Sequence, residues 1–212
     1  MTKRTGVNTI VMVHGVGDGF SDADRAEIGE RLAPDKVVFF NYAPFLDAKR
    51  WPRVFASPLR FAGPLRAFGD EAGDVLAYVA SPSVRADISH GLAQVIRDNK
   101  ANIVVAHSLG TCIAVDALDE SDMVAQLTAK QHSVNLLVGL GSPLWMWTMH
   151  KAAGGHGTLP VVINWVQGIL DPVAGFGRSP RVAGRVHRPP VTHDLVANVY
   201  QAKAIIDKGD WL

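Results

Sequence analysis

Short runs of consecutive apolar residues recur along the chain, separated by longer segments that mix apolar and polar residues. The runs are rich in β-branched residues and do not alternate apolar with polar positions, which is typical of strands covered on both faces in a parallel sheet. They lie at residues 7–13, 36–42, 103–106, 134–140 and 161–166, with a weaker one at 181–187. The pattern predicts a mostly parallel sheet of about six strands.

Segments compatible with helices lie between these runs, so strands and helices alternate along the chain. The predicted helices cover residues 22–32, 70–80, 84–99, 111–127 and 194–208. Such alternation is typical of α/β proteins, in which right-handed crossovers place helices on both faces of the sheet. With 212 residues the chain is long enough to bury a substantial core, and we expect one domain over residues 1–212.

Residues 43–69 break the alternation, because Pro44, Pro52, Pro58 and Pro64 stand among many aromatic and aliphatic residues. The segment is too apolar for a solvated linker, so it must pack on something. We expect a small apolar cap or lid, and packing against the edge of the sheet is the alternative. Residues 172–192 are rich in glycine, proline and arginine and show no strong period.

Composition and charge exclude several classes of partner. A net charge of +1 creates no field that would draw the chain to nucleic acid or to an anionic membrane. The single cysteine, Cys112, excludes an internal disulfide framework. No apolar run approaches the roughly 18 residues of a membrane span, and no cleavage site follows the run at 7–13. We therefore expect a cytoplasmic protein with neither a nucleic-acid partner nor stable membrane insertion.

The most informative stretch is Ala106-His107-Ser108-Leu109-Gly110, which lies between an apolar run and a helix-compatible segment. A serine on a sharp strand-to-helix turn has a strained backbone and presents its hydroxyl clear of the sheet, so we expect this hydroxyl to be exposed rather than packed. The residues two positions before and after it must be small, since strand and helix pack closely there, and Ala106 and Gly110 meet this requirement. A strand–turn–helix with an incidental serine is the alternative.

On these residues the chain resembles the α/β-hydrolase superfamily, whose nucleophile elbow is Gly-x-Ser-x-Gly. The departure is Ala106 in place of the first glycine, a variant also found in some bacterial lipases. The resemblance implies a minimal α/β-hydrolase fold whose sheet begins at the strand of residues 7–13 and lacks the first two strands of a full sheet. It also implies an esterase-like or lipase-like serine hydrolase with Ser108 as nucleophile.

A serine nucleophile needs a base, and the base needs a third group to hold its tautomer. In the family these follow in the order Ser, acid, His. Between Asp122 and Asp194 the sequence contains one carboxylate, Asp171, just after the apolar run at 161–166. We expect Asp171 to be the acid, and an aspartate that caps a turn is the alternative. His193 follows the last apolar run and is the expected base, with His187 as the alternative.

The resemblance further implies an oxyanion hole, in which backbone N–H groups stabilise the charge that develops on the carbonyl oxygen. Leu109 would supply one donor and Val16 the other, with Gly15 allowing close approach of the backbone. The stretch from Gly15 to Gly19 also resembles a dinucleotide-binding turn, but Phe20 occupies the last glycine position of that fingerprint. We therefore expect no cofactor, and no His/Cys/Asp cluster has the spacing of a metal site.

Aromatic residues near these segments indicate the substrate class. The candidates for substrate binding are His14, Phe20, Trp51, Phe55, Trp145 and Trp147. Trp145 and Trp147 follow a strand end, where α/β sheets bind ligands, and core packing is the alternative for both. We expect a small-molecule ester with an apolar or lipid-like acyl group. A catalytically silent binding protein and an acyltransferase are the alternatives.

Overall fold

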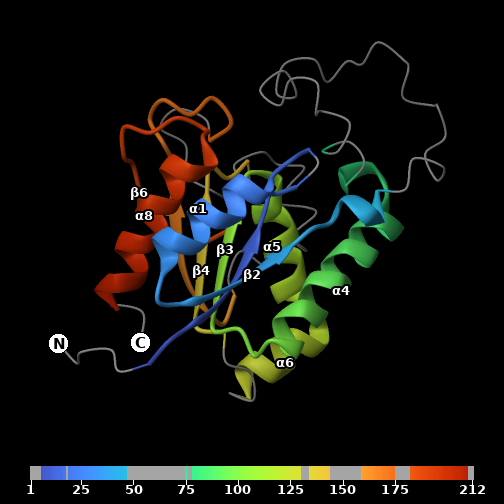
Figure 1. Ribbon diagram of the computed structural model, residues 1–212. Coiled ribbons are helices and arrows are strands. Elements are labelled where there is room, and N and C mark those ends of the chain that lie inside the picture. The colour runs from blue at the N-terminus through green and yellow to red at the C-terminus, as the bar shows by residue number, and fades with distance from the viewer. Residues whose placement is uncertain are drawn as a thin grey trace, which may run out of the picture.

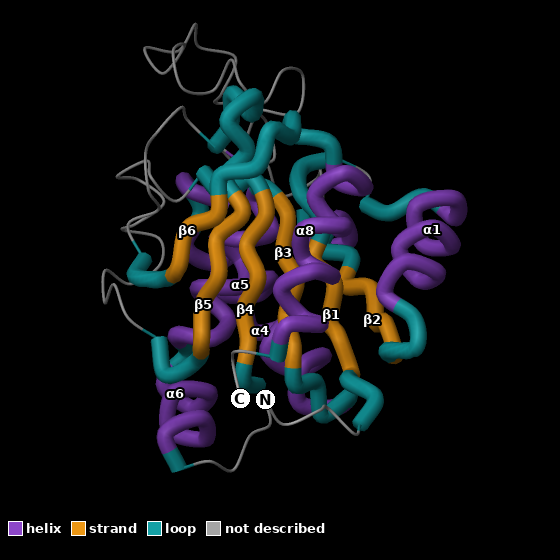
Figure 2. Tube along the Cα trace, turned by 90° about the vertical axis from the view of Figure 1, so that its left-hand side faces the viewer, coloured by secondary structure: helices purple, strands orange, loops and turns teal. Residues whose placement is uncertain are grey.

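Figure 1 shows the computed structural model of the protein, in which residues 6–17, 19–46, 75, 78–129, 134–143, 159–174 and 182–209 are described. These residues contain a six-stranded sheet with the order β2-β1-β3-β4-β5-β6, visible across Figure 2. Every neighbouring pair of strands is parallel. The strands are β1 (Thr9–Val13), β2 (Lys36–Phe40), β3 (Ile103–His107), β4 (Leu136–Leu140), β5 (Val162–Val166) and β6 (Arg185–His187). The predicted parallel sheet of about six strands is confirmed.

The helices are α1 (Asp22–Leu32), α4 (Pro82–Asp98), α5 (Leu109–Asp119), α6 (Ser121–Thr128) and α8 (Leu195–Lys208), with a short 3₁₀ helix at Ala43–Phe45. The prediction of one helix over residues 111–127 is wrong. Glu120 ends α5 and precedes α6 with extended backbone angles, φ −57° and ψ 134°. Residues 119–122 are all polar, so no apolar side chain there can hold a continuous helix against the sheet.

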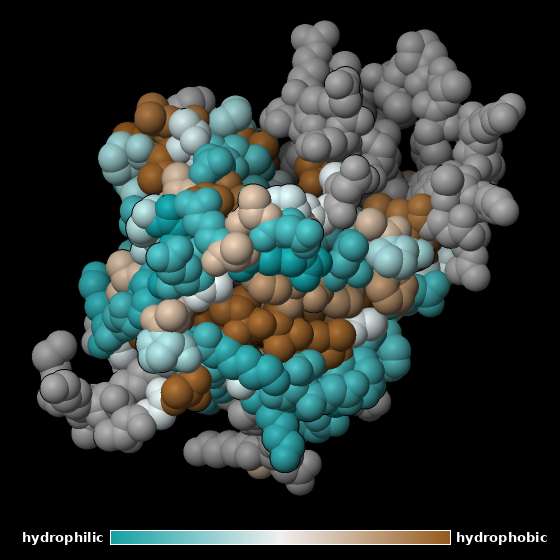
Figure 3. Space-filling view, viewed as in Figure 1, coloured by the Kyte–Doolittle hydropathy of each residue, from teal (hydrophilic) through white to brown (hydrophobic). Residues whose placement is uncertain are grey.

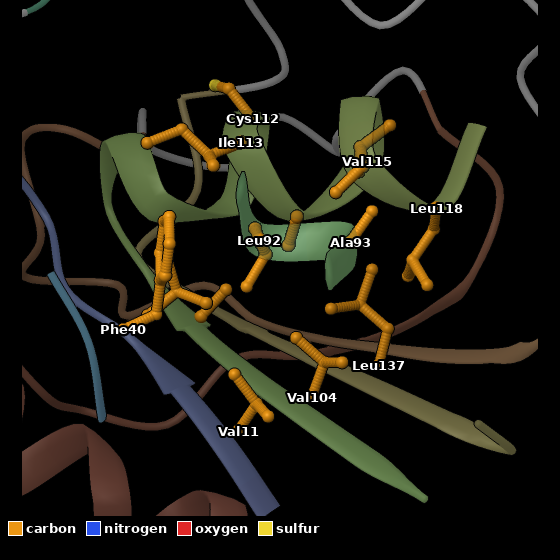
Figure 4. Close-up of a cluster of buried hydrophobic side chains, with 14 of the residues drawn as sticks. Val11, Phe40, Leu92, Ala93, Val104, Cys112, Ile113, Val115, Leu118 and Leu137 are labelled. Carbon is orange, nitrogen blue, oxygen red and sulfur yellow. The ribbon is translucent and has the colours of Figure 1, made fainter. Parts of the chain in front are cut away.

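Two helical layers cover the two faces of the sheet (Figure 1). Helix α4 buries one apolar stripe and α5 is buried on almost all sides, and both contribute to a core with Val11, Val104 and Leu137 of the strands. Figure 4 shows these strand side chains pointing toward α4 and α5. Helices α1 and α8 pack on the other face, where Met12 and Val105 contribute to a second core. Alternate residues of one strand therefore serve two cores, which is why the strands are apolar throughout.

Strand β2 forms one edge of the sheet. Its residues Val37, Val38 and Phe39 are only partly buried. Figure 3 shows an apolar band crossing this face of the molecule where β2 lies. Of the predicted cap at 43–69, the structure describes only residues 43–46, so the cap stays a prediction.

Polar side chains tie together the amino-terminal ends of three strands. Asp35 accepts hydrogen bonds from the backbone N–H and the side-chain amide of Asn8, at 2.8 and 3.3 Å. Asn102 accepts one from the N–H of Thr9 at 2.9 Å and donates one to Asn8 at 2.8 Å. These bonds fix the register of β1, β2 and β3, and thereby align the opposite ends of the strands, where the candidate site lies.

Candidate active site

Ser108 occupies the turn between β3 and α5, and its backbone is strained. Its φ of 52° and ψ of −124° lie in a region that side-chain-bearing residues rarely adopt. Two backbone segments, the end of β1 with its following loop and the turn into α5, pack closely around this conformation. A Cβ atom on Gly110 would lie 2.9 Å from the carbonyl oxygen of Val13, and one on Gly15 would lie 2.7 Å from Cβ of Ser108. The loop after β1 therefore runs directly against the turn.

The Ser108 side chain is buried, which differs from the predicted exposed hydroxyl. The residue is 1% exposed, and its Oγ atom has no hydrogen-bond partner among the described residues. In particular, no hydrogen bond joins Oγ to the ring of His193. The serine backbone is held instead, because the hydroxyl of Thr111 donates to the Ser108 carbonyl at 2.7 Å. The hydroxyl oxygen of Ser142, two residues after β4, lies 2.8 Å from the same hydroxyl.

Asp171 and His193 form a direct pair. Oδ2 of Asp171 lies 2.8 Å from Nδ1 of His193, so this nitrogen carries a proton that it donates to the carboxylate. The other oxygen of Asp171 accepts the backbone N–H groups of Val173 and Ala174 at 2.8 and 3.1 Å. Asp171 is fully buried, whereas a quarter of the His193 side chain is exposed.

The pKa of Asp171 is lowered from its ordinary value despite its burial. Burial by itself raises the pKa, but the hydrogen bond and electrostatic interaction with His193, together with the two backbone N–H groups, outweigh the effect of burial. Asp171 is therefore charged at neutral pH and holds the Nδ1–H tautomer of His193. That leaves Nε2 of His193 as a proton acceptor.

The alternative base, His187, lies apart from this pair. It belongs to β6, and its Nε2 atom lies 2.8 Å from Oδ1 of Asn164 on β5. Its pKa is lowered by burial and by the positive charges of Lys208 and Arg185. The structure thus brings Asp171 together with His193 and not with His187.

Gly141, which the sequence analysis did not single out, lies against the Asp171–His193 pair. A Cβ atom at this position would lie 2.6 Å from Oδ2 of Asp171 and 2.7 Å from Nδ1 of His193. The residue also has a φ of 56°, which favours glycine. A glycine after an apolar strand was the available signal, but such glycines are common in turns.

The two predicted oxyanion-hole donors lie on the loop after β1 and at the start of α5. The hydroxyl of Tyr42 donates to the carbonyl oxygen of Gly15, and the ring of His14 stacks on Tyr42 with centroids 4.2 Å apart. Val16 follows on this loop. Leu109 is the first residue of α5, so its N–H group has no acceptor within the helix. The oxyanion-hole role of Val16 and Leu109 stays a prediction.

Two predicted substrate-binding residues are described, and both are mostly buried. His14 is 3% exposed, and its Nε2 atom lies 3.2 Å from Oδ1 of Asn41. Phe20 is 7% exposed and packs edge-on against His14 and Phe39. Their contact with a substrate therefore stays a prediction. Trp51, Phe55, Trp145 and Trp147 lie outside the described residues.

Other features of the described residues bear on partners. No cluster of His, Cys, Asp or Glu side chains among them has an arrangement that could hold a metal ion. Within the same part of the chain, no helix has the length and apolarity to cross a membrane.

A surface cavity of about 760 Å³ lies between the 3₁₀ helix and α4, and its lining consists of Pro44, Phe45, Ala86, Asp87, His90, Gly91 and Glu120. It does not include Ser108, Asp171 or His193.

No family model matches this sequence, and no curated protein matches it either. Solved structures do match over almost the whole chain. An α/β serine hydrolase homologue from Coxiella burnetii is 13% identical with a TM-score of 0.51, covering 99% of this chain and 89% of its own. Dienelactone hydrolase from Anabaena variabilis is 14% identical with a TM-score of 0.52, covering 97% and 85%.

A thermophilic carboxylesterase from a metagenomic library is 13% identical with a TM-score of 0.52, covering 98% of this chain and 82% of its own. At these identities the likeness concerns the fold. The parallel six-stranded sheet with helices on both faces agrees with it. The chain has the fold of the α/β-hydrolase superfamily.

Proposed function

We propose that the protein is a serine hydrolase that cleaves carboxylic esters, with Ser108 as nucleophile, His193 as general base and Asp171 as the group that orients the base. One observation carries this proposal. At the carboxyl ends of the strands, a fully buried carboxylate pairs with a partly exposed histidine, and a strained serine lies at the same ends. These are the residue types and the chain order of a Ser-Asp-His triad in this fold.

The reaction would proceed through an acyl-enzyme. Oγ of Ser108 attacks the ester carbonyl carbon while its proton moves to Nε2 of His193. The oxyanion that forms accepts hydrogen bonds from the N–H groups of Leu109 and Val16. His193 then gives the proton to the leaving alkoxide, which departs as an alcohol. In the second half, water attacks the acyl group with His193 again as base, which releases the acid and regenerates Ser108.

The charges support these roles. Asp171 is charged at neutral pH because hydrogen-bond donors lower its pKa, so it stabilises the imidazolium that forms when His193 accepts the proton. The Oγ atom of Ser108 is not held by another group among the described residues, so nothing there competes with His193 for it. Catalytic hydrogen bonds are often long without substrate and shorten in the complex.

Two observations support the substrate class. One of the similar structures is a carboxylesterase and another is a dienelactone hydrolase. Ile169 and Leu170, directly before Asp171, are 44% and 54% exposed, which places apolar surface beside the acid. We infer a small ester with an apolar acyl or lipid-like group.

Intact-mass spectrometry after incubation with a fluorophosphonate probe tests the proposal. We expect a single adduct on the wild type and none on Ser108→Ala. Ser89→Ala is a matched control, because Ser89 is also buried but its hydroxyl bonds to the carbonyl of Arg85 on α4. This control should label like the wild type.

An adduct on Ser108→Ala would overturn the assignment of the nucleophile. No adduct on folded wild type would favour a catalytically silent binding protein. If the wild type does label, product analysis with competing alcohols separates a hydrolase from an acyltransferase.

A further inference from the structure

His107, the last residue of β3, lies directly before the candidate nucleophile and is buried, with 8% of its surface exposed. Its Nε2 atom lies 2.9 Å from the backbone carbonyl oxygen of His193, although 86 residues separate the two in sequence. A carbonyl oxygen only accepts hydrogen bonds, so Nε2 of His107 carries the proton. The residue before the serine thus binds the backbone of the candidate base.

The ring of His107 also contacts both sides of the candidate site. Its centroid lies 4.6 Å from that of the His193 ring, at an interplanar angle of 37°. On the other side, a Cβ atom on Gly15 would lie 3.2 Å from Nδ1 of His107. The imidazole of His107 therefore lies between the loop that carries His193 and the loop after β1.

Side chains rather than regular structure hold the loop that carries His193. The amide nitrogen of Asn198 donates to the carbonyls of Thr192 and Asp194, at 2.9 and 2.7 Å. His193 lies between these two residues in sequence, and its backbone carbonyl accepts the hydrogen bond from His107. Asp171 fixes one ring nitrogen of His193, but a ring nitrogen alone does not fix where the backbone of this loop lies.

His107 stays neutral in these surroundings. Its pKa is lowered to about 3, chiefly by burial, and electrostatic interactions with His193 and His14 act in the same direction. The hydrogen bond to His193 and the charge of Asp171 oppose this shift without cancelling it. His107 therefore keeps one proton, on Nε2, over the whole range in which an ordinary histidine titrates.

We propose that His107 is a positioning residue for His193. Its Nε2–H bond and its ring contact hold the loop that carries His193 at a set distance from the loop after β1. They thereby keep the His193 ring against Asp171. This inference rests on the proposed function for its catalytic consequence. The contacts themselves can be tested without turnover.

Two variants separate the hydrogen bond from the ring contact. His107→Phe keeps an aromatic ring and removes the donor, whereas His107→Gln keeps an N–H donor at about the same reach and removes the ring. We expect the rate of fluorophosphonate labelling to fall about 5–10-fold in His107→Phe, as for loss of one hydrogen bond, and to stay within about 3-fold of wild type in His107→Gln. The pH profile of labelling should shift in the Phe variant only, since a looser His193 loses contact with Asp171.

Nuclear magnetic resonance of the ¹⁵N-labelled wild type provides a readout that needs no reaction. The expected signals are a proton on Nε2 but not on Nδ1 of His107 between pH 5 and 8, and a downfield Nδ1 proton for His193. In His107→Phe the His193 signal should exchange faster with water, and in His107→Gln it should persist.

A proton on Nδ1 of His107, titration of His107 near pH 6.5, or wild-type labelling and pH profile in His107→Phe would each overturn the inference. A lower melting temperature of the Phe variant with an unchanged pH profile would show a merely structural role. If the wild type takes no adduct, the proposed function fails. The resonances of His107 and His193 still show whether the hydrogen bond between them is present. If His107→Phe does not fold, the wild-type tautomer and the Gln variant decide.

Discussion

One region at the carboxyl ends of the strands and another between α4 and α5 each hold a largely buried carboxylate, with opposite effects on its pKa. At the carboxyl edge of the sheet, Asp171 accepts hydrogen bonds from two backbone N–H groups and from His193, and its pKa is lowered. Between α4 and α5, Asp116 accepts one from the hydroxyl of Tyr78 and lies 3.9 Å from Arg85. Burial raises the pKa of Asp116 to about 7.

The difference shows that the donors and charges around a carboxylate decide, together with its burial, whether it is charged. Asp119 and Glu120 lie near Asp116 and add to the effect of burial, so this group is often protonated at neutral pH. Asp171 has three donors, including one that can become a cation, and stays charged. A charged, rigidly held acid is what a histidine base requires, and the region around Asp116 does not provide it.

Asp171→Asn should produce the largest effect. The asparagine oxygen can still accept from Val173 and Ala174, which turns the amide nitrogen toward Nδ1 of His193. Nδ1 of His193 must then accept a hydrogen bond from this amide, so the proton of His193 moves to Nε2. Protonated Nε2 can no longer accept the proton of Ser108. We expect kcat for ester hydrolysis to fall about 10⁴-fold with little change in melting temperature. A loss smaller than about 10-fold would remove Asp171 from the triad.

Gly141→Ala should disturb the same pair by steric means. The added methyl group would lie 2.6 Å from Asp171 and 2.7 Å from His193, at a positive φ. We expect kcat/KM to fall about 10²-fold, as for a misplacement of about 1 Å, and the free energy of unfolding to fall by about 1–3 kcal/mol.

Gly29→Ala in α1 is the matched control for Gly141→Ala, since nothing lies within 4 Å of a Cβ atom there. It should be fully active and as stable as the wild type or up to about 1 kcal/mol more stable. Equal activity of both variants would show that the Asp171–His193 geometry does not limit the reaction.

Asp116→Asn should have the smallest effect on activity and change stability only. In the unfolded chain an aspartate has a pKa of about 3.9. Because the folded-state pKa is raised to about 7, the folded protein holds this proton more tightly, and stability is lost as pH rises from about 4 to about 7. Asparagine mimics the protonated form and can still accept from Tyr78.

Urea unfolding at pH 4, 6 and 8 measures this prediction. The variant should match the wild type at pH 4 and exceed it by about 2–4 kcal/mol at pH 8. Asp98→Asn, at an exposed position of α4, should differ by less than about 0.5 kcal/mol throughout. A wild type and an Asp116→Asn variant with the same pH dependence would contradict a raised pKa for Asp116.

Local patterns along the chain were sufficient to predict the strands and most helices. The apolar run before Ser108 and the small residues at 106 and 110 predict the turn, because strand, turn and helix involve neighbours in sequence. The break at Glu120 was missed, since a helix-compatible composition continues across it. The burial of Ser108 was missed as well, because burial depends on residues from distant segments.

The sequence by itself determined the parallel sheet, the strand-to-helix turn at Ser108 and the shortlist of one acid and two histidines, since each follows from residue type and order. Only the tertiary structure decided which histidine meets Asp171. His187 and His193 both follow apolar residues near the end of the chain. They differ in their partners, because the pairing of β6 with β5 places His187 beside Asn164 and away from Asp171. The contact of His107 with His193 likewise depends on β3 and the loop before α8 meeting across the fold, which no pattern within either segment contains.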